Sequence, residues 1–176
     1  HIDIRQHGSG DAGATNALRT LGWKAGVITF LGDCLKCIAA VLTAYLMYGK
    51  THAGMFELLA MYAGVGAVLG HNFPFYLHFR GGKGIAATAG ILWAVNPKAA
   101  AIACLTFIIV VAVTRYVSLG SIILVVIFAV AMVAQGELGE TPLTRVEQYE
   151  LYGLSVFLML LAVYKHRENI KRLLNG

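Results

Sequence analysis

The sequence predicts an all-α polytopic membrane protein, and two observations lead to this prediction. Hydrophobic residues make up 58% of the 176 residues and charged residues only 13%, whereas soluble domains carry about 25% charged residues. The apolar residues also gather in long runs, near the roughly 20 residues that a helix needs to cross a bilayer. Backbone groups in lipid must find their hydrogen bonds within the segment, so these runs are expected to be helices. We interpret residues 1–176 as a single membrane domain.

Six apolar segments follow one another, and we predict that each is a transmembrane helix. They cover residues 22–48, 55–70, 84–95, 97–114, 117–135 and 149–164. The third segment is only about 18 Å long at the rise of an α-helix, which is short of a hydrocarbon core of about 30 Å. The preceding loop with Gly81 and Gly82 is therefore predicted to sit below the membrane surface, where protein or water must cover its backbone.

The first segment carries two charged residues, Asp33 and Lys36, inside apolar sequence. They are three residues apart, so they share a helix face and can pair. Ionisable groups at membrane depth usually face the interior of the bundle. The two residues form either a structural ion pair or a pair that orients a site, and the sequence leaves both open. The cysteines are interpreted as small packing residues between helices, not as metal ligands: Cys34, Cys37 and Cys104.

The basic residues predict the orientation of the chain. If the N-terminus faces the cytoplasm, ten basic residues fall on the cytoplasmic side and three outside, in agreement with the positive-inside rule. The cytoplasmic set is Arg5, Arg19, Lys24, Arg80, Lys83, Arg115, Lys165, Arg167, Lys171 and Arg172, and the outer set is Lys50, Lys98 and Arg145. The net charge of +5 lies in short loops between apolar runs, so no nucleic acid is expected as a partner.

The first polar motif extends from His7 to Asn16 and is followed by Arg19. Three glycines within six residues permit a tight backbone whose N–H groups can converge on an anion. Ser9, Thr15 and Asn16 add side-chain donors, and the guanidinium of Arg19 suits phosphate. The loop also leads into a helix, whose N-terminus favours an anion. The alternative is a flexible turn between two helices.

The second motif covers residues 70–84 and contains His71 and the sequence Gly81-Gly82-Lys83-Gly84. This sequence offers bare backbone beside a cation, as a phosphate site requires. The alternative is a basic loop that only ends a helix.

Two further motifs lie on the same predicted side of the membrane. Residues 115–121 contain Ser118, and residues 164–172 contain His166 and Asn169. The last two residues are three apart and share a helix face. The alternative for the last motif is a basic helix that anchors the chain to anionic lipid.

These motifs resemble the signatures of the bacterial acyl-phosphate:glycerol-3-phosphate acyltransferases, the PlsY family. Residues 8–16 are similar to its G-S-G-N-x-G-A-T-N sequence, and residues 70–74 with 79–84 are similar to G-H-x-[FWY]-P and F-K-G-G-K-G. Asp33 to Lys36 resembles its D-x-x-K motif, and residues 116–119 and 166–170 resemble its remaining motifs. The order and spacing agree from Gly8 to Leu173.

The sequence departs from the family pattern at position 11, where Asp stands in place of Asn. An extra carboxylate beside phosphate groups should weaken anion binding unless it pairs with a nearby cation. The family also has one more helix before the first motif. The resemblance therefore implies seven spans, with the first missing from these 176 residues and six visible.

The resemblance implies transfer of a fatty acyl group from acyl phosphate to the 1-hydroxyl of glycerol 3-phosphate, giving lysophosphatidic acid and phosphate in bacterial phospholipid synthesis. It implies a multi-pass protein of the bacterial cytoplasmic (inner) membrane with its active site facing the cytoplasm. The partners are then the two substrates and the lipid bilayer, with no metal, no cofactor and no obligate protein partner. The rival interpretation is a transporter or channel for an anionic metabolite. The clustering of the polar motifs at one face, with no polar set opposite, argues against it.

By the same resemblance, the residues expected to act in catalysis are Lys83, His166 and Arg19. The residues expected to bind substrate are Ser9, Gly10, Gly13, Thr15, Asn16, Lys36, His71, Gly81, Gly82, Ser118 and Asn169. Two roles stay open for His166. It either holds glycerol 3-phosphate together with Asn169 while a phosphate takes the hydroxyl proton, or it acts as a general base.

Overall fold

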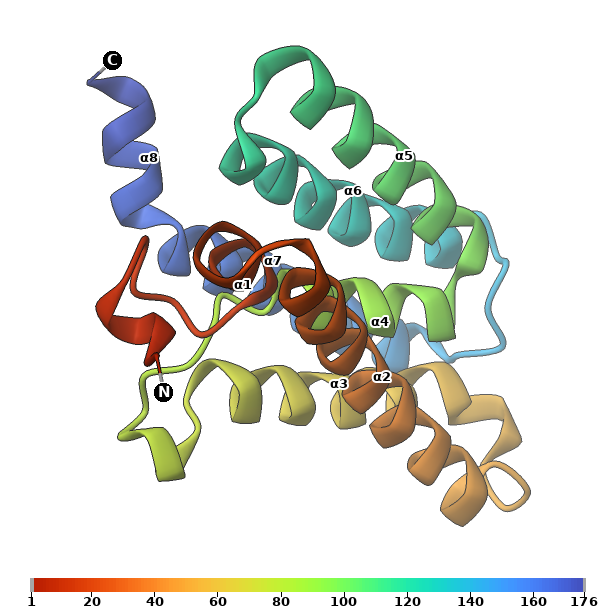
Figure 1. Cartoon of the computed structure of the whole chain (residues 1–176). Helices are drawn as coiled ribbons and strands as arrows, with labels where there is room; N and C mark the ends of the chain where they lie inside the picture. The colour runs from red at the N-terminus through yellow and green to blue at the C-terminus, as the bar shows by residue number, and fades with distance from the viewer. Residues whose placement is uncertain (1, 176) are drawn as a thin grey trace.

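The structure of the protein, a computed structural model, describes residues 2–175 as helices joined by short loops (Figure 1). The α-helices are α1 (Ala14–Leu21), α2 (Trp23–Tyr48), α3 (Phe56–Asn72), α4 (Ile85–Val95), α5 (Pro97–Thr114), α6 (Val117–Glu137), α7 (Arg145–Lys165) and α8 (Arg167–Leu174). Short 3-10 helices are η1 (Ile4–Gln6), η2 (Ala53–Met55) and η3 (Phe75–Leu77). The predicted all-α membrane fold is confirmed.

Five helices in the described part of the chain are long and apolar enough to cross a membrane. They are α2, the stretch Ala53–Leu77 that contains α3, and α5, α6 and α7. Helix α4 is apolar but has only 11 residues, in agreement with the short segment predicted at 84–95. The six predicted spans thus correspond to five full-length helices and one short one.

The short helix α4 is enclosed by longer helices. It packs against α2, α3, α5 and α6, and its residues 87–92 are all buried. Gly90 allows α2 to approach closely, since a Cβ there would stand 2.6 Å from the Cys34 carbonyl oxygen. The Sγ–H of Cys34 in turn donates to the Ala86 carbonyl oxygen at 3.1 Å. Protein also buries residues 81–82, so the non-helical backbone before α4 is covered, as a membrane interior requires.

The core of the bundle joins α3, α4, α6 and α7. Met61, Ile91, Phe128 and Leu158 are each at most 1% exposed. The outer faces of the long helices carry large apolar side chains instead, such as Leu46 on α2, Ile102 and Val113 on α5 and Val130 on α6. An apolar surface of this extent is too large for contact with water, and it suits contact with lipid.

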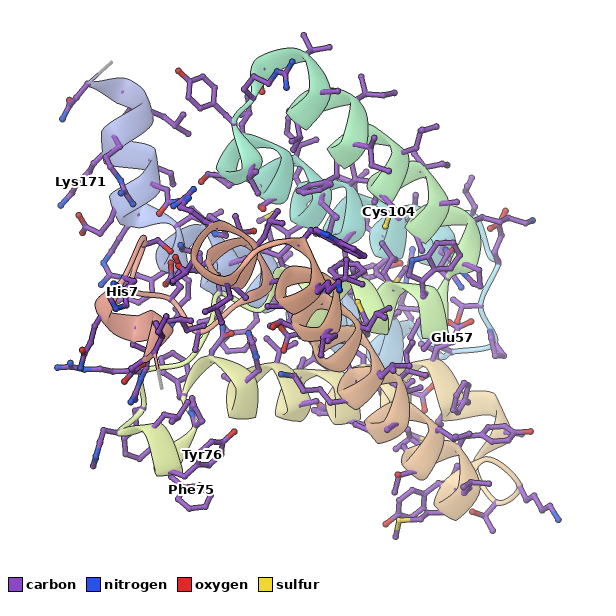
Figure 2. All side chains as sticks on the ribbon, viewed as in Figure 1. His7, Glu57, Phe75, Tyr76, Cys104 and Lys171 are labelled. Carbon is purple, nitrogen blue, oxygen red and sulfur yellow. The ribbon has the colours of Figure 1, made fainter. Side chains whose placement is uncertain are left out.

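The end of the bundle opposite the motifs is joined by a polar network. The carboxylate of Glu57 accepts hydrogen bonds from Gln135 Nε2 at 3.0 Å and from Thr141 Oγ1 at 2.6 Å, and Gln135 Oε1 accepts one from Asn96 Nδ2 at 2.8 Å. Figure 2 shows Glu57 and His7 on opposite sides of the molecule. The end opposite the motifs therefore has a polar set of its own, which corrects the expectation that no polar set lies there.

Candidate active site

The first motif folds into a loop that the side chain of Asn16 holds together. Asn16 is 2% exposed. Its Oδ1 accepts from the Ser9 amide at 2.9 Å, and its Nδ2 donates to the carbonyl oxygens of Ile4, His7 and Asp11 at 2.8–3.0 Å. Asn16 was predicted to bind substrate, but its amide is already occupied by the loop. Its role in the structure is to shape the loop.

Lys83 from the second motif reaches this loop. Its ammonium group donates to the Asp11 carboxylate, and the side chains of this ion pair are 17% and 26% exposed. Gly82 packs against the same loop, because a Cβ on Gly82 would stand 2.9 Å from the Ala12 carbonyl oxygen. Two motifs 72 residues apart thus form one unit. The additional carboxylate at position 11 has the cationic partner that the prediction required.

An ion pair on α2, between the buried Asp33 and the exposed Lys36, positions His71 beside this unit. Lys36 Nζ lies 2.6 Å from Asp33 Oδ1 and 2.7 Å from His71 Nδ1. Because an ammonium group only donates, His71 Nδ1 accepts and the ring proton is on Nε2. A Cβ on Gly82 would overlap His71 Nε2, so the N–H edge of the ring faces the glycine loop. The predicted pairing of Asp33 with Lys36 is confirmed, and the pair also fixes the orientation of His71.

His166 follows the end of α7 and lies near the ion pair. The residue is 3% exposed, and its Nδ1 lies 2.8 Å from the Ala162 carbonyl oxygen. A carbonyl oxygen only accepts, so Nδ1 carries the proton and the lone pair of Nε2 is free. Burial lowers the pKa of His166, and the nearby Lys83 charge lowers it further, against opposing effects of the Ala162 hydrogen bond and Asp11. The imidazole is therefore neutral at pH 7.

Sequence reasoning missed Lys165, which also borders the glycine loop. Its Nζ donates to the Asn72 carbonyl oxygen at 3.3 Å, and the Gly81 amide donates to the same oxygen at 3.3 Å. Its ammonium group also lies 4.9 Å from the centroid of the Phe73 ring. Only its position next to His166 singles out Lys165 in the sequence, and the positive-inside rule explains its charge equally well.

Ser118 and Asn169 meet at the start of α6. Asn169 Nδ2 donates to Ser118 Oγ at 2.5 Å, and Asn169 Oδ1 accepts from Arg172 at 3.1 Å. Together with Tyr116 and Leu173, these residues line a pocket of about 180 Å³. A side-chain contact thus joins the third motif to the fourth, as the Lys83–Asp11 contact joins the second to the first.

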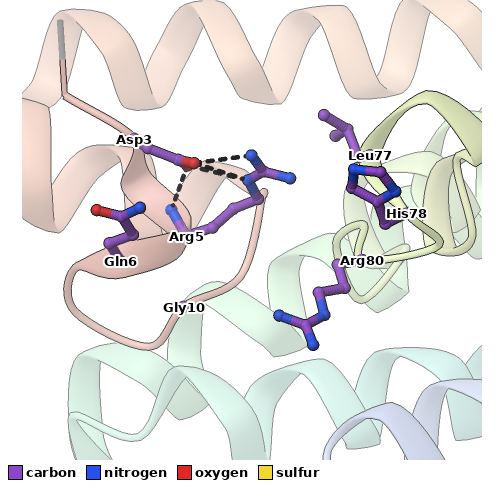
Figure 3. Close-up of a pocket in the computed structure, with 7 residues that line it drawn as sticks. All are labelled: Asp3, Arg5, Gln6, Gly10, Leu77, His78 and Arg80. Carbon is purple, nitrogen blue, oxygen red and sulfur yellow. Dashed lines mark hydrogen bonds and ion pairs between the residues drawn. The ribbon is translucent and has the colours of Figure 1, made fainter.

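A larger pocket of about 520 Å³ opens between the N-terminal segment and the loop after η3 (Figure 3). Its lining residues are Asp3, Arg5, Gln6, Gly10, Leu77, His78 and Arg80. Asp3 holds Arg5 with an ion pair of 2.7 Å, and this contact lowers the pKa of Asp3 to about 2. Of the predicted site residues, the pocket contains Gly10.

Three predicted residues of the first motif lie apart from these contacts. Arg19 and Thr15 are exposed on α1, and within residues 2–175 neither side chain has a hydrogen bond or ion pair. Gly13 caps the start of α1 with an extended backbone, and a Cβ there would meet nothing within 4 Å. In residues 2–175, the exposed guanidinium of Arg19 thus takes no part in the hydrogen bonds and ion pairs that join the motifs.

By these features, the protein is a multi-pass integral membrane protein whose polar motifs are joined at one end of its helices. The family described as Glycerol-3-phosphate acyltransferase matches residues 1–176. The glycerol-3-phosphate acyltransferase of Clostridioides difficile (strain 630) is 46% identical over 178 residues, which cover 99% of this chain and 80% of the relative. That of Geobacter sulfurreducens is 39% identical, covering 99% of this chain and 82% of the relative. The chain belongs to the glycerol-3-phosphate acyltransferase family.

Solved structures of the family agree with this assignment. The crystal structure of PlsY (YgiH), an integral membrane glycerol 3-phosphate acyltransferase, in its glycerol 3-phosphate form has a TM-score of 0.82 at 34% identity, covering 99% of this chain and 80% of that chain. The lysophosphatidic acid form has a TM-score of 0.78 and also 34% identity, covering 96% of this chain and 78% of that chain.

Proposed function

We propose that this protein transfers a fatty acyl group from acyl phosphate to the 1-hydroxyl of glycerol 3-phosphate, giving lysophosphatidic acid and phosphate. One observation carries the proposal: Lys83, in a glycine loop, meets the glycine loop of the first motif, beside the neutral His166. The similar PlsY structures in glycerol 3-phosphate and lysophosphatidic acid forms support the acceptor and the product. The donor, acyl phosphate, is inferred from the resemblance of the sequence motifs alone.

Lys83 and the backbone of the glycine loops bind phosphate in this proposal. Gly81 and Gly82 are buried and pack directly on His71 and Ala12, so the loop is fixed before substrate arrives. Acyl phosphate is a mixed anhydride and phosphate is its leaving group. Positioning of the two substrates and stabilisation of the negative charge therefore supply most of the catalysis.

His166 receives the hydroxyl group of glycerol 3-phosphate. Its Nε2 can only accept a hydrogen bond in the tautomer that Ala162 selects, and a substrate hydroxyl is a suitable donor. The hydroxyl oxygen attacks the acyl carbon and forms the ester bond, while the bond from the acyl carbon to the phosphate oxygen breaks. The hydroxyl proton goes either to the leaving phosphate or to Nε2, in which case His166 is the general base.

The site faces the cytoplasm in a bacterial cytoplasmic membrane. The charge distribution of the sequence supports this orientation, because Lys83, His166 and the basic helix α8 all lie on the predicted inner side. The acyl chain then lies along the apolar helix faces and reaches the site from the bilayer.

The test is turnover by the purified full chain in detergent with palmitoyl phosphate and glycerol 3-phosphate. We expect phosphate and lysophosphatidic acid in equal amounts, and no product when palmitoyl-CoA replaces palmitoyl phosphate. Lys83→Met should reduce kcat/KM by at least about 100-fold. Uptake of glycerol 3-phosphate into proteoliposomes without any turnover would instead support a transporter.

Replacement of His166 by Gln separates the two roles of this residue. A rise mainly in the KM for glycerol 3-phosphate supports a binding role, with phosphate as the proton acceptor. A fall mainly in kcat, by about 100-fold or more, supports the general base.

A further inference from the structure

We propose that Asp11 sets the affinity of this site for phosphate, because its carboxylate occupies the anion position beside Lys83 until a substrate phosphate displaces it. The inference rests on the proposed function, and it assigns a role to the position at which this chain departs from the family pattern by a full negative charge.

The geometry of the ion pair carries the first step. Among residues 2–175, the Asp11 carboxylate is the acceptor that Lys83 Nζ contacts. The pair is mostly enclosed, with side chains 17% and 26% exposed, so solvent screens it less than a surface pair. A phosphate that binds Lys83 would stand beside this carboxylate, and two anions a few ångströms apart repel each other strongly in a partly buried place. Phosphate and carboxylate therefore compete for Lys83.

The loop allows the carboxylate to leave without unfolding. The backbone at Asp11 is fixed, because its carbonyl oxygen accepts from Asn16 Nδ2 at 3.0 Å. The side chain is not fixed in this way, since Lys83 is the partner that holds its carboxylate in the described residues. Rotation about the side-chain bonds of Asp11 then exposes Lys83 while Asn16 preserves the loop.

Lys165 is a second cation that favours an anion at the position beside Lys83 once the Asp11 carboxylate has left it. Lys165 contacts the Asn72 carbonyl oxygen, which also accepts from Gly81, so its ammonium group borders the loop that carries Lys83. An ammonium group has three donors, and one of those of Lys165 is used in this contact. The remaining donors are available to a phosphate or to the displaced carboxylate.

The experiment measures the binding of inorganic phosphate to the full chain in detergent by isothermal titration calorimetry. Asp11→Asn removes the charge and keeps the shape, and we expect the Kd for phosphate to fall about tenfold, the effect of losing one competing ion pair of about 1.4 kcal/mol. Glu137→Gln is the matched control, because Glu137 is also an acid that pairs with a cation, Arg145 at 2.7 Å, and it lies at the end of α6 away from the four motifs. Its Kd should stay within about twofold of the wild-type value.

A double-mutant cycle separates competition from a general change of charge. In a Lys83→Met background, Asp11→Asn should lower the Kd by clearly less than about tenfold, because the competition for Lys83 is gone and only the repulsion between the two anions remains. An unchanged or higher Kd in Asp11→Asn would overturn the proposal, and so would an equal gain in affinity in Glu137→Gln. Asp11→Ser is the second variant if Asp11→Asn fails to fold. Binding is measured without turnover, so the result is readable even if the acyltransferase assay fails.

Discussion

The side-chain amide of Asn169 donates a hydrogen bond of 2.5 Å to the hydroxyl oxygen of Ser118. This contact joins the C-terminal helix α8 to the first turn of α6, 51 residues earlier in the chain. It fixes the third and fourth motifs relative to each other, and it holds the Asn169 amide in one position.

Ser118→Ala should therefore loosen α8 and weaken the binding of glycerol 3-phosphate. Loss of one hydrogen bond of about 1 kcal/mol corresponds to a rise in KM of about fivefold. Steady-state kinetics measure it. Ser121→Ala is the control, because the Ser121 hydroxyl donates within its own helix to Val117, and its KM should match the wild type. Equal KM values in both variants would remove the proposed role of the Ser118–Asn169 contact.

Gly82→Ala should disrupt the junction between the two glycine loops. The added methyl group would overlap His71 Nε2 and the Ala12 carbonyl oxygen, and overpacking of this kind costs about 1–3 kcal/mol. We expect a lower melting temperature and the loss of most turnover. Gly66→Ala on α3 is the control, since a Cβ there meets nothing within 4 Å. A Gly82→Ala variant with full activity would contradict the close packing of these loops.

The sequence predicts the helices well because their hydrophobic runs are long. It places the start of the last span at 149, whereas α7 begins at Arg145. The first turn of α7 is polar, so a hydropathy pattern does not include it. Thr144 and Glu147 nevertheless mark this start, because they form a capping box.

The site is less predictable because its contacts join distant parts of the chain. The motifs marked Lys83 and His166 as polar residues of one face. They did not reveal that the side-chain amide of Asn16 forms its hydrogen bonds within its own loop. They also did not reveal that Lys165 contacts Asn72, 93 residues away. Such contacts depend on how helices pack, which the period of a sequence does not encode.

Asp33→Asn should weaken the cluster that orients His71. The Lys36 ammonium would keep its charge without the carboxylate at 2.6 Å, so it would no longer be held in place as the donor to His71 Nδ1. The cost should be about 1.5–3 kcal/mol, as for other hydrogen bonds between charged groups, because Asp33 is buried within a membrane-spanning helix. Thermal unfolding in detergent measures it. The double variant with Lys36→Met should recover stability, because it removes the unpaired charge. Its turnover should remain low.

Lys165→Met should raise the KM for the phosphate-bearing substrates about tenfold, because a cation beside the glycine loop is lost. Lys171→Met provides the comparison. Lys171 lies on α8 (Figure 2) and pairs at 3.5 Å with Glu168 on the surface, so its loss should change the KM by less than about twofold. Similar effects of both substitutions would indicate that Lys165 acts only through the overall positive charge of this face.

Acidification should destabilise the protein through His166. Burial lowers the pKa of His166 below its ordinary value, which is about 6.5 in an unfolded chain. As the pH falls below this value, His166 becomes protonated in the unfolded chain but stays neutral in the folded protein. The unfolded state then binds more protons, and the stability contributed by neutral His166 is complete above about pH 6.5 and lost progressively below it.

Melting temperatures measured between pH 8 and pH 5 check this prediction. His166→Gln has no proton to gain, so its melting temperature should decline less on the acid side than that of the wild type. His52→Gln is the control, because it removes an exposed histidine from the loop between α2 and α3, and its acid decline should match the wild type. If His166→Gln and the wild type lose stability in parallel, His166 is not the group that the folded state keeps neutral. The pKa of His166 would then lie near its ordinary value of about 6.5, and protonation of Nε2 would compete with acceptance of the substrate hydroxyl as the pH falls below 7.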